Sequence, residues 1–469
     1  MNAIYNKINN TIIEQLKQIV ANEDVLTDNE NLEKYGQDET EDFIYKPEVV
    51  VKPKTVSQIS EIMKLANLNK IPVTARGSGT GLSGAALPIH GGIVISMERF
   101  CNILNIDERN LQATVEPGVI NYIFQEEVKK VGLFYPPDPA SWGSCSLGGN
   151  VAHSSGGPKA VKYGTTRDYV LNIEMVLPNG DIIWTGANTL KYSTAYNLTH
   201  LMVGSEGTLG IITKIVFRLI PLPKHDVLML VPFTSAEKAC EAVGATFRAG
   251  IIPSAMEFME RDAIDWSIKY AGEVNFEIKP EWQALLLIEV DGNNMDVLFS
   301  DCEIIANIMN EHGSDEILMA DSAEQKAALW KIRRKVGEAV KSNSVYKEED
   351  TVVPRAELPK LLQGVKAIGN KYGFKSVCYG HAGDGNLHVN IIKGDLSDDI
   401  WEKELPKGIT EIFELCKQLG GTISGEHGIG LVQKNYLPIV FPEFHLELMR
   451  NIKKLFDPNL ILNPGKMVF

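Results

Sequence analysis

Residues 380–390 concentrate reactive side chains that are spread thinly over the rest of the chain. This stretch reads Gly-His-Ala-Gly-Asp-Gly-Asn-Leu-His-Val-Asn and holds two histidines and three glycines. His388 opens an alternating run that predicts a strand, and the glycines before it permit a tight reversal that brings His381 near the same strand end. Two imidazoles would then converge on one point. The residues alone also fit a glycine-rich turn whose histidines only hydrogen-bond to their neighbours.

A second polar pair, Glu426 and His427, is also enclosed by glycines. Glycines precede this pair at 420 and 421 and follow it at 428 and 430, so the backbone around it is free to turn. Glu426 with His381 and His388 makes a set of two neutral nitrogens and one carboxylate. Such a set suits Zn, Mn or Fe and leaves coordination positions open for a substrate. Spacing alone does not establish that the three residues converge.

Residues 76–85 form the first of three glycine-rich segments that accompany predicted strands. The segment reads Arg-Gly-Ser-Gly-Thr-Gly-Leu-Ser-Gly-Ala and contains the Gly-x-Gly-x-x-Gly pattern of a dinucleotide site, which requires a helix to begin there. Pro88 and the two glycines after it exclude that helix, and residues 93–97 are strand-like. We therefore expect a long loop between strands that cradles a diphosphate through backbone N–H groups. A flexible surface loop is the other interpretation.

Two further glycine-rich segments lie at 136–168 and 203–210. Between them, Asn179-Gly180 separates two strand-like runs and predicts a β-hairpin. The last segment precedes another strand-like run at 211–219. Three glycine loops attached to strands would together wrap one long, flat, anionic ligand.

Segments 76–85, 136–168 and 203–213 together resemble the FAD-binding domain of the vanillyl-alcohol oxidase and p-cresol methylhydroxylase superfamily. Residues 381–388 and 424–430 narrow the resemblance to the FAD-linked D-2-hydroxyacid dehydrogenases. That group contains glycolate oxidase D subunits, D-lactate dehydrogenases and D-2-hydroxyglutarate dehydrogenases. The resemblance runs from about residue 38 to the C-terminus and implies an enzyme that oxidises a D-2-hydroxy acid to the 2-oxo acid.

The resemblance also implies which residues bind FAD. The first glycine loop would lie on the pyrophosphate. Some members of the superfamily attach FAD covalently through a histidine in that loop, but Thr80 stands at the matching position here, so we expect non-covalent FAD. The expected FAD-binding residues are Arg76, Gly77, Ser78, Gly79, Thr80, Gly81, Pro137, Asp138, Gly148, Gly149, Asn150, Gly156, Gly157, Tyr163, Gly164, Thr166, Gly204, Glu206, Gly207 and Ile211.

In relatives, the residues that match His381, His388 and Glu426 bind a divalent metal that chelates the hydroxyl and carboxylate oxygens of the substrate. Coordination of an alcohol to a dication lowers its pKa. His427 is then the expected general base, because the unperturbed pKa of histidine, about 6.5, is close to operating pH. It would take the hydroxyl proton as the α-hydrogen leaves as hydride to flavin N5. The other interpretation makes His427 a third imidazole ligand, with Glu426 behind the ligands.

A carboxylate substrate also requires a cation. Arg333 lies in a stretch that resembles the substrate-binding arginine of the family, and a guanidinium can bind a carboxylate with two hydrogen bonds. Lys347 matches a lysine of the 2-hydroxyglutarate branch, although the three acidic residues after it depart from that branch. Either side chain could instead be a solvated cation on a helix or its following loop.

The elements that must position these residues predict an α+β protein. The resemblance implies a two-subdomain FAD-binding domain of the p-cresol methylhydroxylase type at 1–220 and a C-terminal segment at 421–469 that returns to it, and the pattern of elements predicts a substrate-binding cap with an antiparallel sheet at 221–420. Near the N-terminus, apolar spacing predicts a helix around 12–20, and Thr55 with Gln58 forms a capping-box pattern. In the cap, strands are expected at 227–233, 255–259, 284–290, 316–320 and 388–392, with helices at 236–247, 296–310, 323–341, 358–372 and 401–419.

Length and charge exclude several classes of protein. A chain of 469 residues with 44% hydrophobic residues fits two or three globular domains. The net charge of -14 and the lack of a basic, aromatic-rich run argue against nucleic acid as a partner. Six scattered cysteines form no Cys-x-x-Cys pair, and neither a signal peptide nor a transmembrane segment is evident. We therefore expect a cytoplasmic, reduced setting.

Other functions remain open from the sequence. Alkyl-dihydroxyacetone-phosphate synthase shares the fold and FAD, but its family has a run of histidines where this chain has Gly-Glu-His. An FAD-carrying electron-transfer subunit of a larger complex is the third possibility. Because the chain has no iron–sulfur motif, an electron-transferring flavoprotein, an iron–sulfur subunit, a quinone or a cytochrome must reoxidise the flavin, in a homodimer or a hetero-complex. Among substrates we expect a small acid, D-lactate or glycolate.

Overall fold

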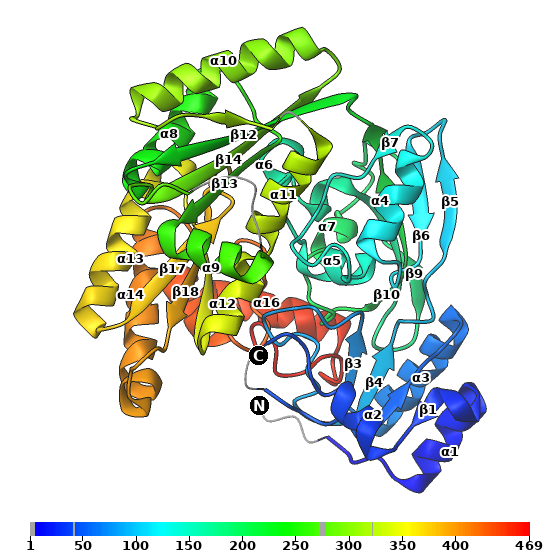
Figure 1. Ribbon diagram of the computed structural model, residues 1–469. Helices are drawn as coiled ribbons and strands as arrows, with labels where there is room; N and C mark the ends of the chain where they lie inside the picture. The colour runs from blue at the N-terminus through cyan, green and yellow to red at the C-terminus, as the bar shows by residue number, and fades with distance from the viewer. Residues whose placement is uncertain (1–4, 41–42, 273–277, 321) are drawn as a thin grey trace. The chain divides into compact units, whose positions relative to one another are not determined.

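The computed structural model describes residues 5–40, 43–272, 278–320 and 322–469, and the chain divides into two compact units (Figure 1). The first unit comprises Met1–Ser155, Thr165–Leu222 and Glu426–Phe469, and the second comprises Gly156–Gly164 and Pro223–Gly425. The units divide after Leu222 and after Gly425, and the sequence-based domain boundaries lie at 220 and 420. The short segment Gly156–Gly164, which we expected in the FAD-binding domain, belongs instead to the second unit.

The N-terminal part of the first unit is a four-stranded sheet in the order β1-β2-β4-β3. Strands β2, β4 and β3 are parallel, and β1 pairs antiparallel with β2. Two helices bury Leu16, Ile59 and Ile62 against it, and the predicted capping box of Thr55 with Gln58 begins the second helix. The elements are α1 (Asn10–Ile19), β1 (Val25–Leu26), α2 (Asn29–Lys34), β2 (Val49–Val51), α3 (Val56–Asn69), β3 (Val73–Arg76) and β4 (Ile93–Ser96).

The remainder of the first unit contains a five-stranded antiparallel sheet in the order β5-β6-β10-β8-β9. The predicted hairpin joins β8 and β9, and Gly180 has the positive φ of 87° that such a turn requires. Helices α4, α5 and α7 were not predicted. The elements are β5 (Ile103–Asp107), β6 (Gln112–Val115), α4 (Asn121–Lys129), β7 (Leu133–Phe134), α5 (Leu147–His153), β8 (Val170–Val176), β9 (Ile182–Trp184), α7 (Leu198–Met202), β10 (Ile211–Arg218) and β11 (Ile220–Pro221).

The C-terminal segment completes the first unit. It carries α15 (Leu437–Val440) and α16 (Glu443–Phe456) and then runs beside β3. There the N–H of Val73 donates to the carbonyl of Ile461 at 2.8 Å, and the N–H of Asn463 donates back to Val73 at 2.7 Å.

The second unit is built on a seven-stranded sheet in the order β15-β12-β14-β13-β17-β18-β16, and all of its pairs are antiparallel. This agrees with the antiparallel cap that the sequence predicted. The expected strand at 316–320 is reduced to two residues. The strands are β12 (His225–Phe233), β13 (Ala255–Glu260), β14 (Ala284–Gly292), β15 (Leu318–Met319), β16 (Tyr346–Val352), β17 (Lys375–Gly380) and β18 (Asn386–Ile392).

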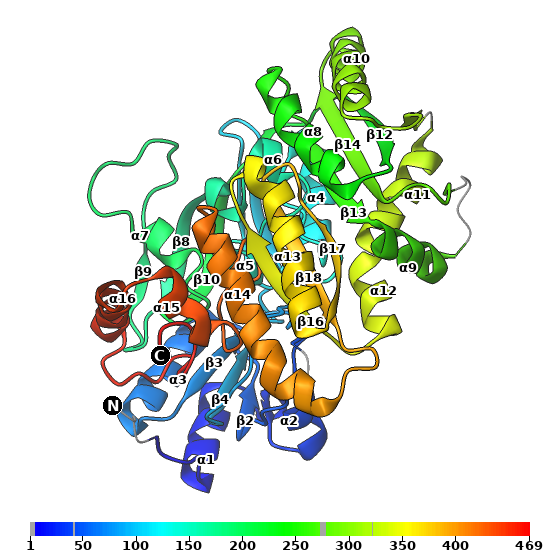
Figure 2. The ribbon, with the colours of Figure 1, turned by 90° about the vertical axis from the view of Figure 1, so that its left-hand side faces the viewer.

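Helices cover both faces of this sheet (Figure 2). Helices α9, α11 and α12 bury Ile264, Ile332 and Val336 on one face, called here the α12 face, whereas α8, α10, α13 and α14 pack on the other. The single helix predicted at 323–341 is two helices, because the backbone of Lys335 leaves helical geometry with ψ near 1°. The helices are α8 (Ala236–Arg248), α9 (Arg261–Ala271), α10 (Met295–Glu311), α11 (Ala323–Arg334), α12 (Val336–Asn343), α13 (Leu358–Tyr372) and α14 (Leu405–Gln418).

Candidate active site

Strand alternation gathers polar side chains on the α12 face of the second unit. Met259, Tyr379, Tyr346 and Ile392 belong to the apolar cluster under α9, α11 and α12. Because successive side chains of a strand point to opposite faces, the residues two or four positions away from these share that face. They are Glu257 of β13, His388 and Asn390 of β18, and Glu348 and Asp350 of β16.

His381 and His388 lie next to each other, as the sequence predicted. His388 pairs with Tyr379 across β17 and β18, and His381 follows the end of β17. Their ring centroids are 5.4 Å apart with the ring planes at 82°, and both side chains are buried. The reversal between them requires glycine: Gly385 has φ of 86°, and a Cβ there would lie 2.0 Å from the carbonyl oxygen of Val353.

Glu257 fixes the orientation of His381. Its fully buried carboxylate places both oxygens 2.9 Å from Nδ1 of His381. An ionised carboxylate only accepts hydrogen bonds, so Nδ1 carries the proton and Nε2 keeps its lone pair. A carboxylate in this position also raises the basicity of the ring as a metal ligand.

His388 lies near two carboxylates, at longer distances than His381 lies from Glu257. Its Nδ1 lies 3.5 Å from Oε1 of Glu348 and 3.7 Å from Oδ1 of Asp350. His381 thus presents Nε2 as a ligating atom, and a second buried imidazole lies beside it, which is part of the donor set of a divalent transition metal site. The residues of this face therefore fit a metal.

Arg333 lies within the same group of residues. It belongs to α11, is 5% exposed, and places Nη2 2.7 Å from Oε2 of Glu257. The guanidinium lies 5.1 Å from the ring centroid of Tyr379, and its Nε has no hydrogen-bond acceptor among the residues that the structure describes. A buried guanidinium with a donor to spare is suited to a substrate carboxylate.

Lys347 does not lie with this group. It is in β16 rather than in a loop, and it alternates with Glu348, so it points to the opposite face of the sheet. Its Nζ lies 5.5 Å from the ring centroid of Trp401. Glu348, the next residue, occupies the face that carries the histidines, and the expected substrate contact of Lys347 stays a prediction.

Four residues of the α12 face were missed from the sequence: Glu257, Glu348, Asp350 and Asn390. Asn390 is fully buried two positions after His388 and lies opposite Glu348 in the β16–β18 pair. A polar residue at that position of an alternating strand was a usable signal. Glu257 was signalled by its place inside the otherwise apolar run Ala-Met-Glu-Phe-Met.

The three glycine segments meet within the first unit. In the first glycine loop (residues 77–92, between β3 and β4), a Cβ on Gly77 would lie 2.4 Å from Oγ of Ser146 and 3.9 Å from the backbone nitrogen of Gly149. The third glycine loop (residues 203–210) contacts α5, because the N–H of Gly204 donates to Val151 and that of Glu206 to Ala152. The loops thus converge as one ligand would require.

Arg76 provides a cation where the first glycine loop begins. Its side chain is buried, and Nη1 has no hydrogen-bond acceptor among the described residues. Gly79, with φ of 74°, allows the backbone to pass this guanidinium, since a Cβ there would lie 2.2 Å from Nη2. A buried guanidinium at the base of a glycine loop fits the diphosphate of a dinucleotide.

The carboxylate of Glu206 accepts hydrogen bonds from backbone groups of the first unit. Its backbone has a positive φ of 51°, and its carboxylate accepts from the N–H groups of Ile429 and Gly430, each at 2.7 Å. The carbonyl of His427 lies 3.0 Å from Nδ1 of His153. Glu206 therefore holds the turn after His427, and its expected role as a cofactor ligand stays a prediction.

Other expected cofactor residues are explained by packing. Ile211 lies in the apolar core of the first unit, and Gly148 passes Pro117, whose Cβ would be 2.4 Å from an added Cβ. Thr166 donates its hydroxyl to the carbonyl of Ser155 at 2.8 Å. The remaining expected FAD-binding residues lie in or beside the three glycine segments, and their role in binding FAD stays a prediction. They are Ser78, Thr80, Gly81, Pro137, Asp138, Gly149, Asn150 and Gly207.

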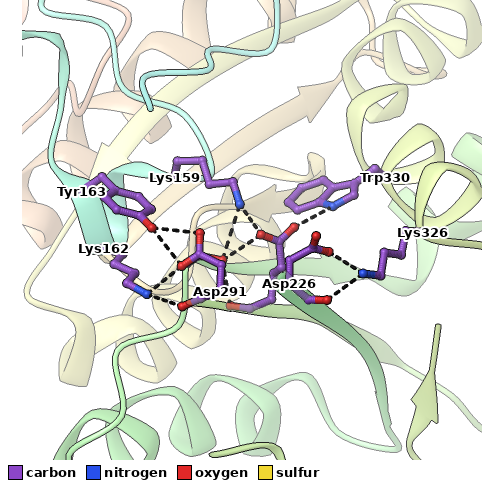
Figure 3. A network of polar contacts seen from close by, with 9 residues as sticks. Lys159, Lys162, Tyr163, Asp226, Asp291, Lys326 and Trp330 are labelled. Carbon is purple, nitrogen blue, oxygen red and sulfur yellow. Dashed lines mark hydrogen bonds and ion pairs between the residues drawn. The ribbon is translucent and has the colours of Figure 1, made fainter. Parts of the chain in front are cut away.

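Tyr163 belongs to the second unit with Gly156, Gly157 and Gly164. Its hydroxyl lies 2.9 Å from both carboxylate oxygens of Asp291, to which Lys162 also donates (Figure 3). Lys159 pairs with Glu289 beside it. The hydroxyl of Tyr163 thus anchors this segment on β14.

Comparison with known proteins identifies the family. Residues 47–186 match the FAD binding domain, and residues 222–467 match the family "FAD linked oxidases, C-terminal domain". The chain therefore belongs to the FAD-linked oxidases and is an FAD-dependent oxidoreductase.

Relatives at full length carry related names. The chain is 37% identical to a D-lactate dehydrogenase of Anaerostipes hadrus, over 99% of this chain and 98% of the relative. It is 37% identical to the glycolate oxidase subunit GlcD of Bacillus subtilis (strain 168), over 98% and 97%. It is 32% identical to a D-2-hydroxyglutarate dehydrogenase of Stutzerimonas stutzeri (strain A1501), over 97% and 98%.

Solved structures agree in fold. p-Cresol methylhydroxylase superposes with a TM-score of 0.80 at 18% identity, over 98% of this chain and 96% of the other. Alkyldihydroxyacetonephosphate synthase gives 0.77 at 18% identity, over 99% and 86%. These likenesses concern the fold alone. Within the described part of the chain, none of the helices has the length and apolar character needed to cross a membrane.

Proposed function

We propose that the protein is an FAD-dependent dehydrogenase that oxidises a small D-2-hydroxy acid to the 2-oxo acid. The observation that carries the proposal is the group on the α12 face. Two buried imidazoles lie side by side, one of them with Nδ1 turned to Glu257, and the buried guanidinium of Arg333 shares that carboxylate. A 2-hydroxy acid offers the complementary groups, a carboxylate for the guanidinium and two chelating oxygens.

Glu426 directly follows a residue that is hydrogen-bonded to this group of side chains. Gly425, the last residue of the second unit, donates its N–H to Oδ2 of Asp350 at 2.8 Å, and Asp350 pairs with His388 in the sheet. The Cα of Glu426 follows that of Gly425 by about 3.8 Å. This attachment supports Glu426 as the carboxylate that joins His381 and His388 in holding Zn, Mn or Fe.

The reaction divides the work among few residues. Arg333 binds the carboxylate of the substrate and fixes its orientation. A divalent cation held by the two imidazoles and Glu426 supplies Lewis acidity that makes the hydroxyl easier to deprotonate. His427 would take the hydroxyl proton, and FAD, when bound, would supply the oxidant that accepts the α-hydrogen with its electron pair. Glu206 accepts hydrogen bonds from the turn that follows His427, so the backbone next to the proposed base is fixed.

The choice of substrate and acceptor rests on the relatives. Relatives at 37% identity are named for D-lactate and glycolate, which supports a small acid. Glu348 on the face that carries the histidines adds negative charge there, which opposes a second substrate carboxylate. Because the Bacillus subtilis relative is named as a subunit, a protein acceptor of the electrons is part of the proposal.

Anaerobic reduction of the bound flavin tests the proposal. D-lactate, glycolate, D-2-hydroxyglutarate and L-lactate are added in turn while the flavin absorbance is recorded. We expect rapid bleaching by D-lactate or glycolate, its loss after treatment with a chelator, and recovery on adding Zn or Mn. If none of the four acids reduced the flavin, the proposed dehydrogenase activity would be disproved. If the chelator did not change the rate of reduction, the proposed metal site would be disproved.

A further inference from the structure

Three polar side chains of the C-terminal segment reach the glycine loops of the first unit. Asn463 and Lys466 contact the first glycine loop, and Asn463 and Lys453 contact the third. All three side chains are buried. The two loops are far apart in the sequence, and these side chains join them.

Lys466 contacts the end of the first glycine loop. Its ammonium donates to the carbonyl oxygens of Ala85 at 3.2 Å and Leu87 at 2.5 Å, and to Oδ1 of Asn463 at 3.1 Å. The side chain is 1% exposed, and burial lowers its pKa from the usual 10.5 to about 7. A buried lysine whose acceptors are neutral oxygens weakens the fold, so its retention calls for a role.

Asn463 bridges the two loops directly. Its Nδ2 donates to the carbonyl of Ala85 in the first loop at 2.9 Å and to that of Glu206 in the third loop at 2.8 Å. Lys453 adds a donation to the carbonyl of Thr208 at 2.7 Å and pairs with Asp457.

The backbone of the segment is strained where it makes these contacts. Leu460, Asn463 and Met467 have positive φ values of 53°, 45° and 54°. Residues other than glycine enter this region at an energetic cost, and they persist where the surroundings fix them, often at functional sites.

The contacts orient donors of the loops. In a trans peptide the carbonyl and the following N–H point in opposite directions. Holding the carbonyls of Ala85 and Glu206 toward the C-terminal segment therefore turns the N–H groups of Ala86 and Gly207 to the other side. Backbone N–H groups with a fixed direction are what a diphosphate-binding loop needs.

We propose that Asn463 and Lys466 are positioning residues for FAD, which clip the first and third glycine loops into the arrangement that binds the cofactor. The proposal rests on these loops as the FAD site and is independent of substrate and metal. Loss of either residue leaves both loops in place but releases their orientation, so FAD binds more weakly and leaves faster.

The test uses Lys466→Met, which removes the donors at similar length, and Asn463→Gly, which tolerates the positive φ without the bridging amide. Lys454→Met, at an exposed position of α16 beside Lys453, is the matched control. We expect FAD to dissociate from the holoenzyme about tenfold faster in both variants, and the control to stay within about twofold of the wild type. The melting temperature of the deflavinated Asn463→Gly protein should change little, and that of deflavinated Lys466→Met should not fall below the wild type, because Lys466 is a buried cation.

Two results would overturn the proposal that Asn463 and Lys466 position the glycine loops for FAD. One is an FAD dissociation rate in both variants within about twofold of the wild type. The other is a lowered melting temperature of the deflavinated variants with unchanged FAD dissociation, which would assign the residues to folding alone. Failure of the flavin to be reduced by any hydroxy acid would reject the proposed function and leave this inference intact, because the dissociation rate needs no substrate.

Discussion

The carboxylate of Glu257 lies 2.9 Å from Nδ1 of His381, and its Oε2 also lies 2.7 Å from Nη2 of Arg333. One buried anion thus serves the imidazole proposed to hold the metal and the guanidinium proposed to hold the substrate. The position of each partner depends on the other through this carboxylate. Mutation of Glu257 should therefore affect both functions.

Glu257→Gln should lower metal affinity by about 10- to 100-fold, because a neutral amide no longer supports the ligating ring of His381. The measurement is the affinity for Zn or Mn by competition with a chromogenic chelator. Glu260→Gln, in the same strand but paired with Lys366 on the other face, is the control and should bind metal as the wild type does. Equal metal affinity in Glu257→Gln and the wild type would contradict the assignment of His381.

Arg333→Lys should weaken substrate binding by roughly 10- to 100-fold, since an ammonium loses the forked geometry of a guanidinium with a carboxylate and a charged hydrogen bond contributes about 1.5–3 kcal/mol. The substrate concentration giving half-maximal flavin reduction reports the change. Arg334→Lys, the next residue, stacks on Trp330 and is the matched control. If both variants behaved alike, Arg333 would not be the carboxylate ligand.

Lys347→Met should leave the reduction of the flavin by D-lactate and by D-2-hydroxyglutarate unchanged, because Lys347 faces Trp401 on the opposite side of the sheet. Glu348→Gln should raise the rate of flavin reduction by D-2-hydroxyglutarate relative to the rate with D-lactate, because it removes a negative charge next to His388. The ratio of the two reduction rates is the quantity to compare. A lower rate with D-2-hydroxyglutarate in Lys347→Met alone would restore Lys347 to the site.

The case of Lys347 shows what the sequence could and could not predict. Alternation within 388–392 was sufficient to place His388 on a strand, and the glycines around it correctly indicated the reversal. The strand β16 begins shortly after the end of a helix, and the residues between them do not fix which side chains of the strand face which side of the sheet. The local sequence therefore did not show whether Lys347 or Glu348 faces the histidines. A slip of one residue exchanges the faces of a strand.

Long-range contacts limited the prediction in the first unit. Glu206 lies in a glycine motif, and nothing near it in the sequence indicates that its carboxylate accepts hydrogen bonds from Ile429 and Gly430, more than two hundred positions away. The break at Lys335 was also invisible, because residues 323–341 keep helical periodicity on both sides of it. Element types follow from local patterns, whereas partners across the fold do not.

The stability of the protein should depend on pH through Lys466. Its pKa is about 7 in the folded chain because of burial, opposed by Asp38 and Glu206 and assisted by Lys434, whereas an unfolded lysine titrates near 10.4. Between these values the unfolded state binds more protons, so the free energy of unfolding rises with pH in this window. Relative to Lys466→Met, the wild type should gain stability from pH 7 to 9 in denaturant titrations of the deflavinated proteins. A difference that does not vary with pH would disprove the lowered pKa.

His427→Ala should retain FAD but lose at least about 100-fold in the rate of flavin reduction, which is the usual contribution of a positioned base. The flavin should stay because the substitution leaves the backbone at this position, which is held by His153 and by the Glu206 turn. Bound flavin absorbance and the single-turnover reduction rate separate the two effects. His445→Ala, on an exposed position of α16, is the control for loss of an imidazole. If His427→Ala kept its reduction rate but lost metal affinity, His427 would be the third imidazole ligand and the base would lie elsewhere.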